Sequence, residues 1–188
     1  MEKLVPQIKS FLKESLSPYR FQHSLTVANI SVELAKKHKV SSEKTEIAAL
    51  LHDCAKEMPL ENLLKNVSIY NIELDSIQKR IPQLLHALVG AKIAATKFNI
   101  KDKNILSAIE KHTTGHEVMT NLDKIIYISD YLASKVSDKI KNIAVANLDS
   151  AVIEVAAKII TLQLKKNSLI HNNTIKCWNK HVEKISSI

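Results

Sequence analysis

The stretch Ile47-Ala48-Ala49-Leu50-Leu51-His52-Asp53-Cys54-Ala55-Lys56 decides how the rest of the chain can be interpreted. Its apolar residues are typical of a buried helix, which delivers an imidazole and a carboxylate side by side. Packing alone gives no reason for such a polar pair in an apolar setting. A divalent cation does, because a neutral imidazole nitrogen and a carboxylate oxygen are common ligands of Fe, Mn and Zn.

The composition of the chain favours an all-α fold in a single domain, residues 1–188. This length is enough for one complete hydrophobic core. Apolar residues make up 45% of the chain, and only two glycines and four prolines are available for turns. No apolar run approaches the ~20 residues that a membrane helix needs. Both cysteines lie in apolar helical patterns, so we expect a cytoplasmic protein without a disulfide framework.

The formal charge of +8 has two interpretations. The lysines are spread along the chain, which is typical of solvated helix faces. The same charge also creates a field that attracts polyanions such as nucleotides. Nucleic acid is not an expected partner, because the chain has no arginine-rich stretch and only one Trp, four Tyr and three Phe.

Amphipathic patterns, prolines and capping residues predict a string of helices. The expected ranges are about 3–16, 19–38, 43–56, 82–97, 102–112, 122–134, 148–166 and 174–186, with short helices between 60 and 80. The last helix is expected to bury Ile175, Trp178, Val182 and Ile185.

Further candidate ligands lie on other predicted helices. His23 lies beside an apolar stripe, and Asp130 lies in an apolar run where an unpaired carboxylate is costly to bury. Taken singly, a histidine is more often a packed or a surface residue than a ligand. With His52 and Asp53 they supply two imidazoles and two carboxylates, and a helical bundle can bring such groups together in its core. We interpret His38 and His181 as solvated, His116 as loop surface and Cys54 as a buried thiol.

A wider set of motifs resembles the YqeK family of the HD metal-phosphohydrolase superfamily, over residues 18–180. The motifs are Tyr19-Arg20-Phe21-Gln22-His23-Ser24, His52-Asp53 with Ala55-Lys56, His86 with Val89-Gly90-Ala91, Lys111-His112-Thr113-Thr114-Gly115, Tyr127-Ile128-Ser129-Asp130-Tyr131, and Leu169-Ile170-His171 with Thr174. Each motif is weak alone, and the combination is specific.

The resemblance implies a helical HD-domain bundle with a metal site in its core. It implies a symmetrical bis(5'-nucleosyl)-tetraphosphatase, which splits diadenosine tetraphosphate into two ADP with a metal-activated water. A divalent metal, iron first and Mn, Co or Zn as alternatives, is expected on His23, His52, Asp53 and Asp130. The implied nucleotide contacts are Arg20, Asp53, Cys54, Ala55, Lys56, His86, His112, Thr113, Asp130, Ile170, His171 and Thr174.

The proton and charge chemistry is assigned to four residues: Asp53, Lys56, His86 and His112. Asp53 would hold the metal and orient the water, and Arg20 and Lys56, with protonated His86 or His112, would offset charge on the phosphates. His86 or His112 would also donate a proton to the leaving ADP. Alternatively, these two histidines would ligate a second metal.

The chain departs from the family pattern after Asp130. The family reads Asp-Tyr-Ile-Glu-Pro and then an arginine, whereas here the Glu-Pro is missing, about four residues are deleted and Val136 takes the arginine position. Leu88 also replaces a proline. An arginine is a bidentate phosphate donor, which Lys135 replaces only as a point charge.

Three alternatives remain open at this stage. The first is an HD nucleotidase that acts on mononucleotides or dNTPs. The second is a di-iron oxygenase on the same scaffold. The third is a non-catalytic protein that binds ADP as a sensor. The sequence does not fix the oligomeric state, and it is compatible with a homodimer through an exposed helix face.

Overall fold

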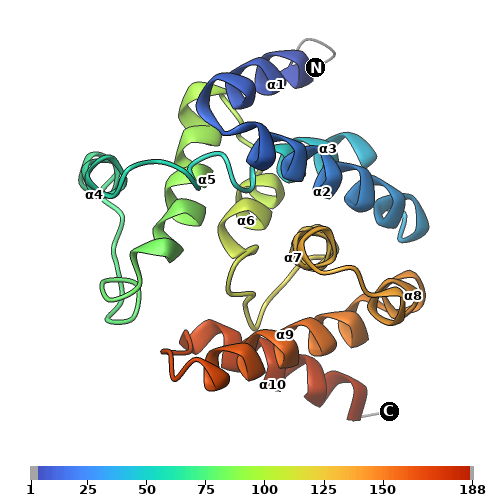
Figure 1. Ribbon diagram of the computed structural model, residues 1–188. Coiled ribbons are helices and arrows are strands. Elements are labelled where there is room, and N and C mark those ends of the chain that lie inside the picture. The colour runs from blue at the N-terminus through green and yellow to red at the C-terminus, as the bar shows by residue number, and fades with distance from the viewer. Residues whose placement is uncertain (1–3, 187–188) are drawn as a thin grey trace.

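The computed structural model describes residues 4–186, and within them the regular structure is entirely helical (Figure 1). This confirms the all-α prediction. The α-helices are α1 (Leu4–Ser15), α2 (Pro18–Lys37), α3 (Ser42–Leu51), α4 (Leu60–Ile69), α5 (Leu85–Lys97), α6 (Lys103–Lys111), α7 (Asn121–Ser134), α8 (Asp138–Ala146), α9 (Leu148–Lys165) and α10 (Asn172–Ser186), and a 3-10 helix covers Pro82–Leu84. No helix in this part of the chain is both long enough and apolar enough to cross a membrane.

Local sequence signals explain where most helices begin. The side chains of Asp102 and Asn147 accept hydrogen bonds from the backbone at the starts of α6 and α9, where the sequence favours them as N-caps. The sequence also favours Ser42 and Asn121 as N-caps, but the caps are the preceding residues, Ser41 for α3 and Thr120 for α7. Helix α3 also ends at Leu51, so the residues that follow it form turns and not the predicted helical extension to residue 56.

Helix α8 was not predicted from the sequence. Ser137 caps its start by accepting a hydrogen bond from the backbone of Ile140, and Ile140 and Ala144 are buried. The helix is nine residues long and buries few side chains, so its apolar pattern is weak. It directly follows the segment that departs from the family pattern.

Two hydrophobic clusters form the core, and they meet along α2 and α7. One cluster joins α1, α3, α5 and α6, and the other joins α7, α8, α9 and α10 with the end of α2. Helix α2 packs against both α3 and α7, and α7 packs against α6 and α9. In Figure 1, α1, α2 and α3 lie above α7, and α9 and α10 lie below it. The ends of α3 and α6 therefore face α2 and α7.

The buried face of α10 differs from the prediction. Helix α10 buries Thr174, Cys177 and His181, whereas Ile175 and Ile185 are 37% and 41% exposed. The prediction that His181 is solvated was therefore wrong. Its Nδ1 donates to the carbonyl of Cys177 at 2.7 Å, and its Nε2 lies 3.4 Å from Asp149 Oδ1, so polar partners make the burial tolerable.

Asp149 is the centre of a charge cluster that joins three helices. Its Oδ1 accepts from the buried Lys124 of α7 at 2.9 Å and from Lys184 of α10 at 3.3 Å, while Asp149 itself belongs to α9. Burial alone would raise the pKa of Asp149. The two lysines outweigh that effect and lower the pKa below its ordinary value of 3.8.

The pH dependence of stability follows from this lowered pKa. Because the folded-state pKa is below that of the unfolded chain, the contribution of Asp149 is complete above about pH 4 and is lost as the pH falls through the folded-state value. We expect Asp149→Asn to lower the free energy of unfolding by about 2 kcal/mol at pH 7, with a smaller difference near pH 3. Urea unfolding at both pH values checks this, and an equal difference at the two would contradict it.

The turn between α6 and α7 depends on Gly115. This residue has φ +65°, and its N–H donates to the carbonyl of Lys111 at 2.9 Å. A Cβ built on Gly115 would lie 2.6 Å from Cys177 Sγ and 3.1 Å from Cys177 Cβ. The turn therefore requires glycine both for its backbone conformation and for its close approach to α10.

Substituting Gly115 tests this requirement. We expect Gly115→Ala to lower the free energy of unfolding by about 3 kcal/mol, through the left-handed backbone and the clash with Cys177. Cys177→Ala removes the Sγ atom that the new Cβ would meet. In a Cys177→Ala background, Gly115→Ala should therefore lower the free energy of unfolding by less than it does in the unsubstituted protein. Chemical unfolding of the four proteins measures the coupling, and purely additive effects would show that the clash is absent.

Candidate metal centre

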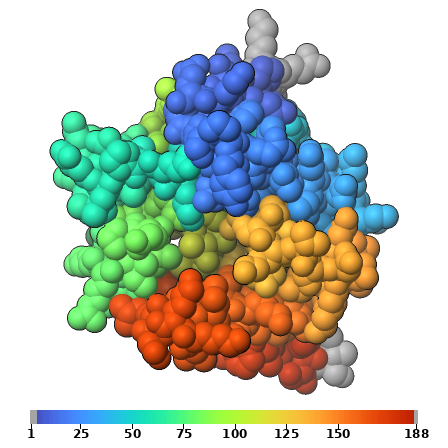
Figure 2. Space-filling model, in the orientation of Figure 1, coloured from blue at the N-terminus to red at the C-terminus, as the bar shows by residue number. Residues whose placement is uncertain are grey.

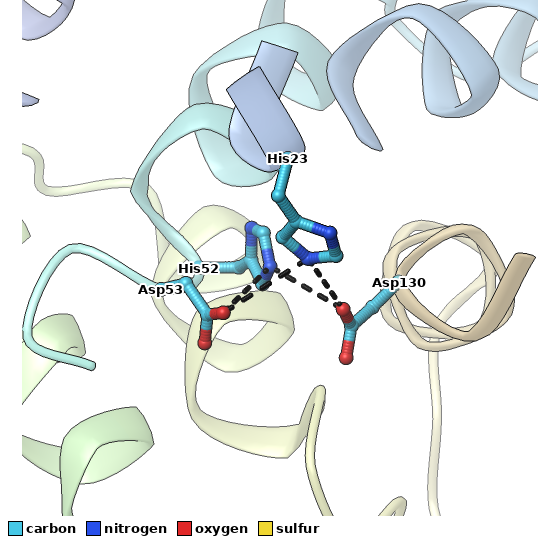
Figure 3. A group of neighbouring side chains, drawn as sticks. All are labelled: His23, His52, Asp53 and Asp130. Carbon is cyan, nitrogen blue, oxygen red and sulfur yellow. Dashed lines mark hydrogen bonds and ion pairs between the residues drawn. The ribbon is translucent and has the colours of Figure 1, made fainter. Parts of the chain in front are cut away.

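Four side chains from three parts of the fold converge between the two clusters (Figure 3). His23 comes from the buried face of α2, His52 and Asp53 follow the end of α3, and Asp130 projects from α7. One ligand atom of each residue lies within 4.8 Å of the others. The sequence prediction that these four residues meet is thus confirmed as geometry, and the set can hold a metal ion.

The separations are those of a site that needs a cation at its centre. His23 Nε2 lies 2.9 Å from Asp130 Oδ1 and 3.9 Å from Asp53 Oδ2. His52 Nε2 lies 3.6 Å from each of the same two oxygens. Two imidazole nitrogens and two carboxylate oxygens therefore surround one small volume, which suits Fe, Mn, Co or Zn.

His52 gives the clearest indication of a missing positive charge. Its Nδ1–H donates to the carbonyl of Ala49 at 2.6 Å, so the neutral ring presents a lone pair on Nε2. That Nε2 is buried and has no hydrogen-bond partner. Burial would lower the pKa of His52, but Asp53 and Asp130 outweigh it and raise the pKa. The atom therefore needs a proton or a metal ion, which fits the expected metal group.

Asp53 uses its two oxygens in different directions. Oδ2 faces the centre and accepts from Arg20 Nη1 at 3.0 Å, while Oδ1 lies 3.1 Å from His86 Nε2 and 3.4 Å from His112 Nε2. Burial would raise the pKa of Asp53, but the adjacent imidazoles hold it well below 3.8, so the group is a carboxylate. The pKa of Asp130 is also lowered against its burial, by the hydrogen bond from His23 and by the charge of the nearby His52.

His86 and His112 form a second possible ligand group with Asp53. The Nδ1–H groups of His86 and His112 donate to the carbonyls of Gln83 and Ile109, and their Nε2 atoms lie 3.1 Å apart. Both Nε2 lone pairs are thus directed at one point near Asp53 Oδ1. This arrangement can hold a second cation, with Asp53 as the bridging carboxylate.

Burial lowers the pKa of His86 to about 4, and the charges of Lys56 and His112 act in the same direction against the opposing effect of Asp53. His86 is therefore neutral at pH 7 in this structure, and protonation of His86 or His112 beside bound phosphates stays a prediction. His86 Nε2 accepts from Lys56 Nζ at 3.2 Å, so the positive charge is on the lysine.

The remaining predicted contacts lie around this centre or apart from it. Arg20 and Lys56 are partly exposed at its rim, and Thr113 Oγ1 donates to His112 Nε2 at 3.1 Å. The side chains of Cys54 and Ala55 are buried. Burial and the Asp53 charge raise the pKa of Cys54 to about 12, so this thiol is not a nucleophile at neutral pH.

A cavity of about 240 Å³ reaches the centre at Lys56 and His86, and two further cavities share Thr113. One, of about 370 Å³, contains the predicted residues Ile170, His171 and Thr174, together with Thr113 and Arg80. His171 Nε2 bonds to Asp75 Oδ2 at 2.8 Å across this region. The other cavity, of about 400 Å³, opens on His112 and Asp130 and is bordered by α9.

Sequence reasoning missed the residues that complete these cavities. Arg80, which borders the cavity of about 370 Å³, lies in an irregular segment without a periodic pattern, and the lysines of α9 look like ordinary solvated charges. Nothing in the sequence alone identifies them, because their position depends on how α9 and α10 pack under α7.

Comparisons with known proteins agree with this geometry. The HD domain family matches residues 20–135. The symmetrical bis(5'-nucleosyl)-tetraphosphatase of Bacillus subtilis is 31% identical over 89% of this chain and 92% of its own, and that of Staphylococcus aureus is 31% identical over 93% of each. A crystal structure from Clostridium acetobutylicum, of a predicted HD superfamily hydrolase involved in NAD metabolism, has a TM-score of 0.91 and 34% identity, and covers 95% of this chain and 97% of that one.

Metal content tests the ligand set directly. We expect the metal content of His52→Ala and of Asp53→Ala to be lower than that of the unsubstituted protein by about tenfold or more. A chelator should lower the melting temperature of the unsubstituted protein and leave that of His52→Ala unchanged, because the bound metal stabilises only a folded site that can bind it. Elemental analysis and thermal unfolding measure both effects. His116→Ala is the matched control, and full metal retention in both ligand variants would refute the assignment.

Proposed function

The chain belongs to the HD-domain family and, within it, to the symmetrical bis(5'-nucleosyl)-tetraphosphatases, and we propose that it hydrolyses diadenosine tetraphosphate to two ADP in a metal-dependent reaction. The observation that carries this proposal is the position of Asp53. One oxygen faces His23, His52 and Asp130, and the other faces His86 and His112. Phosphate groups that bind beside Asp53 would have the proposed metal ligands on one side and the imidazoles of His86 and His112 on the other.

We propose His23, His52, Asp53 and Asp130 as the metal ligands, with iron as the first candidate and Mn, Co or Zn as alternatives. A divalent ion in such a site lowers the pKa of a coordinated water toward ~7 and offsets the negative charge of a phosphate. The ionised carboxylates of Asp53 and Asp130 and the Nε2 atom of His52, which has no hydrogen-bond partner, are groups that metal binding requires. A second ion on Asp53, His86 and His112 is the alternative to a role of these two histidines in proton transfer.

Arg20 and Lys56 are the proposed phosphate-binding cations. Both contact Asp53, and both reach the rim of the site, with side chains 24% and 32% exposed. A phosphate oxygen that enters at the rim is therefore within reach of both groups. The guanidinium offers two parallel N–H donors and the ammonium a point charge, so together they orient the chain of phosphates and reduce charge repulsion in the transition state.

His86 and His112 are the proposed proton carriers. Their Nδ1 atoms are fixed by backbone carbonyls, so only Nε2 of each ring faces the phosphates. A neutral His86 takes up a proton readily once a polyanion lies beside it, since negative charge raises the pKa of an imidazole. The ring can then donate that proton to the departing ADP oxygen.

The nucleoside of one ADP half is proposed to bind in the cavity of about 370 Å³ that contains Ile170, His171 and Thr174. This cavity shares Thr113 with the surroundings of His112, so a nucleotide there points its phosphates at the centre. Backbone groups near Cys54 and Ala55 are proposed to complete the phosphate contacts, because their side chains are buried.

The departure at Val136 bears on rate and not on the metal site. Val136 is 93% exposed and borders neither cavity, whereas Lys135 borders the cavity of about 400 Å³. We further propose that the chain acts as one cytoplasmic domain, in agreement with its two buried free cysteines. A homodimer stays a prediction.

Product analysis tests the proposed function. We expect the metal-loaded protein to convert diadenosine tetraphosphate to ADP alone, and we expect chelation or Asp53→Ala to lower the rate by at least about a hundredfold. Anion-exchange chromatography resolves ADP from AMP, ATP and phosphate. Equal amounts of AMP and ATP would exclude symmetrical cleavage, release of phosphate from mononucleotides would favour the nucleotidase alternative, and intact substrate with bound ADP would favour the sensor.

A further inference from the structure

The cavity of about 400 Å³ lies directly beside the metal centre and is not used by any role assigned so far. His112 and Asp130 border it on the side of the centre, and α9 borders it on the other side. Figure 2 shows the corresponding hollow at the middle of this face, between α7 and α9. A ligand in this cavity would touch the centre at one end and helix α9 at the other.

Three lysines surround the opening of this cavity. Lys135 follows α7, and Lys158 and Lys165 lie on one face of α9, seven residues or two turns apart. Within residues 4–186, none of the three has an ion-pair partner, whereas Lys124 and Lys139 each bind a carboxylate. Three unpaired ammonium groups beside one cavity create a local field that favours a polyanion.

The walls of the same cavity suit a nucleoside. Ile159 and Leu162 contribute apolar surface, and Leu162 is 40% exposed although it belongs to a long helix. Tyr131 contributes an aromatic ring, on which a base can stack. The hydroxyl of Tyr127 is buried in this region and has no hydrogen-bond partner, so it needs one from a ligand or a water.

The two cavities are neighbours on either side of a shared wall. Thr113 and Ile159 border both of them, and Thr113 Oγ1 lies 3.1 Å from Nε2 of His112 in the centre. A substrate with two equal nucleoside halves needs a place for each half when the bond at its middle lies at the centre. One cavity accommodates only one of these halves.

We infer that the cavity bordered by Lys135, Lys158 and Lys165 binds the second nucleoside diphosphate half of the substrate. This inference rests on the proposed function, because it assumes a substrate with two such halves. The lysines act as specificity-determining residues that hold the phosphates and ribose of this half, and Tyr131 and Leu162 contact its base. The metal-loaded protein then holds one ADP in each cavity after cleavage.

Counting bound ADP tests the inference independently of turnover. Equilibrium dialysis of the metal-loaded protein against labelled ADP should give two ADP per chain, and one for Lys158→Ala/Lys165→Ala. The matched control is Lys92→Ala/Lys166→Ala, which removes the same charge from two exposed lysines outside the cavities and should keep two ADP. Leu162→Trp fills the cavity without a charge change and should also reduce the count to one.

Kinetics with the dinucleotide give a second readout. We expect KM for diadenosine tetraphosphate to rise roughly tenfold in Lys158→Ala/Lys165→Ala and to stay unchanged in the control variant. One ADP per chain in the unsubstituted protein, or two in the lysine variant, would overturn the inference even if cleavage is symmetrical. Two ADP per chain without cleavage of the dinucleotide would support the second subsite and overturn the proposed function.

Discussion

The carboxylate of Asp53 is the constraint on which the rest of the site depends. It is 2% exposed and negatively charged, and each of its oxygens must be matched by donors or cations. Arg20 and Lys56 offset part of the negative charge from the rim, and imidazole rings surround the carboxylate on its other sides. Because the histidines turn their Nδ1 atoms to backbone carbonyls, their lone pairs point at the same region. The fold thus concentrates acceptors where a divalent cation satisfies all of them at once.

The metal-binding geometry was readable from the sequence because its signals are local. His52 and Asp53 directly follow an apolar helix, and His23 and Asp130 lie on two further helices, α2 and α7, that the sequence predicts. In contrast, Lys158 and Lys165 carry no signal of their own, since an exposed lysine on α9 looks the same whether or not a cavity lies beside it. His181 was misjudged for a related reason. Its burial depends on Asp149, which comes from another helix and pairs with two lysines.

The segment after Asp130 shows how a local departure from the family pattern can leave the centre intact. Asp130 belongs to α7, which is fixed by its Thr120 cap and by packing against α2, α6 and α9. The altered residues follow the end of that helix, and Ser137 begins α8 immediately afterwards. The change therefore affects the border of one cavity and not the position of the carboxylate. The sequence can vary in this segment because it lies outside the packed core, between the end of α7 and the start of α8.

The pairing of His23 with Asp130 joins residues 107 positions apart in the chain. Contacts of such long range form late in folding, because closing a long loop costs entropy before any contact is gained. The ligand set is therefore incomplete in any partly folded chain in which α2 has not yet met α7. A chain emerging from synthesis would hold its cation weakly until α7 is in place. Metal binding therefore stabilises only molecules in which α2 and α7 have already met.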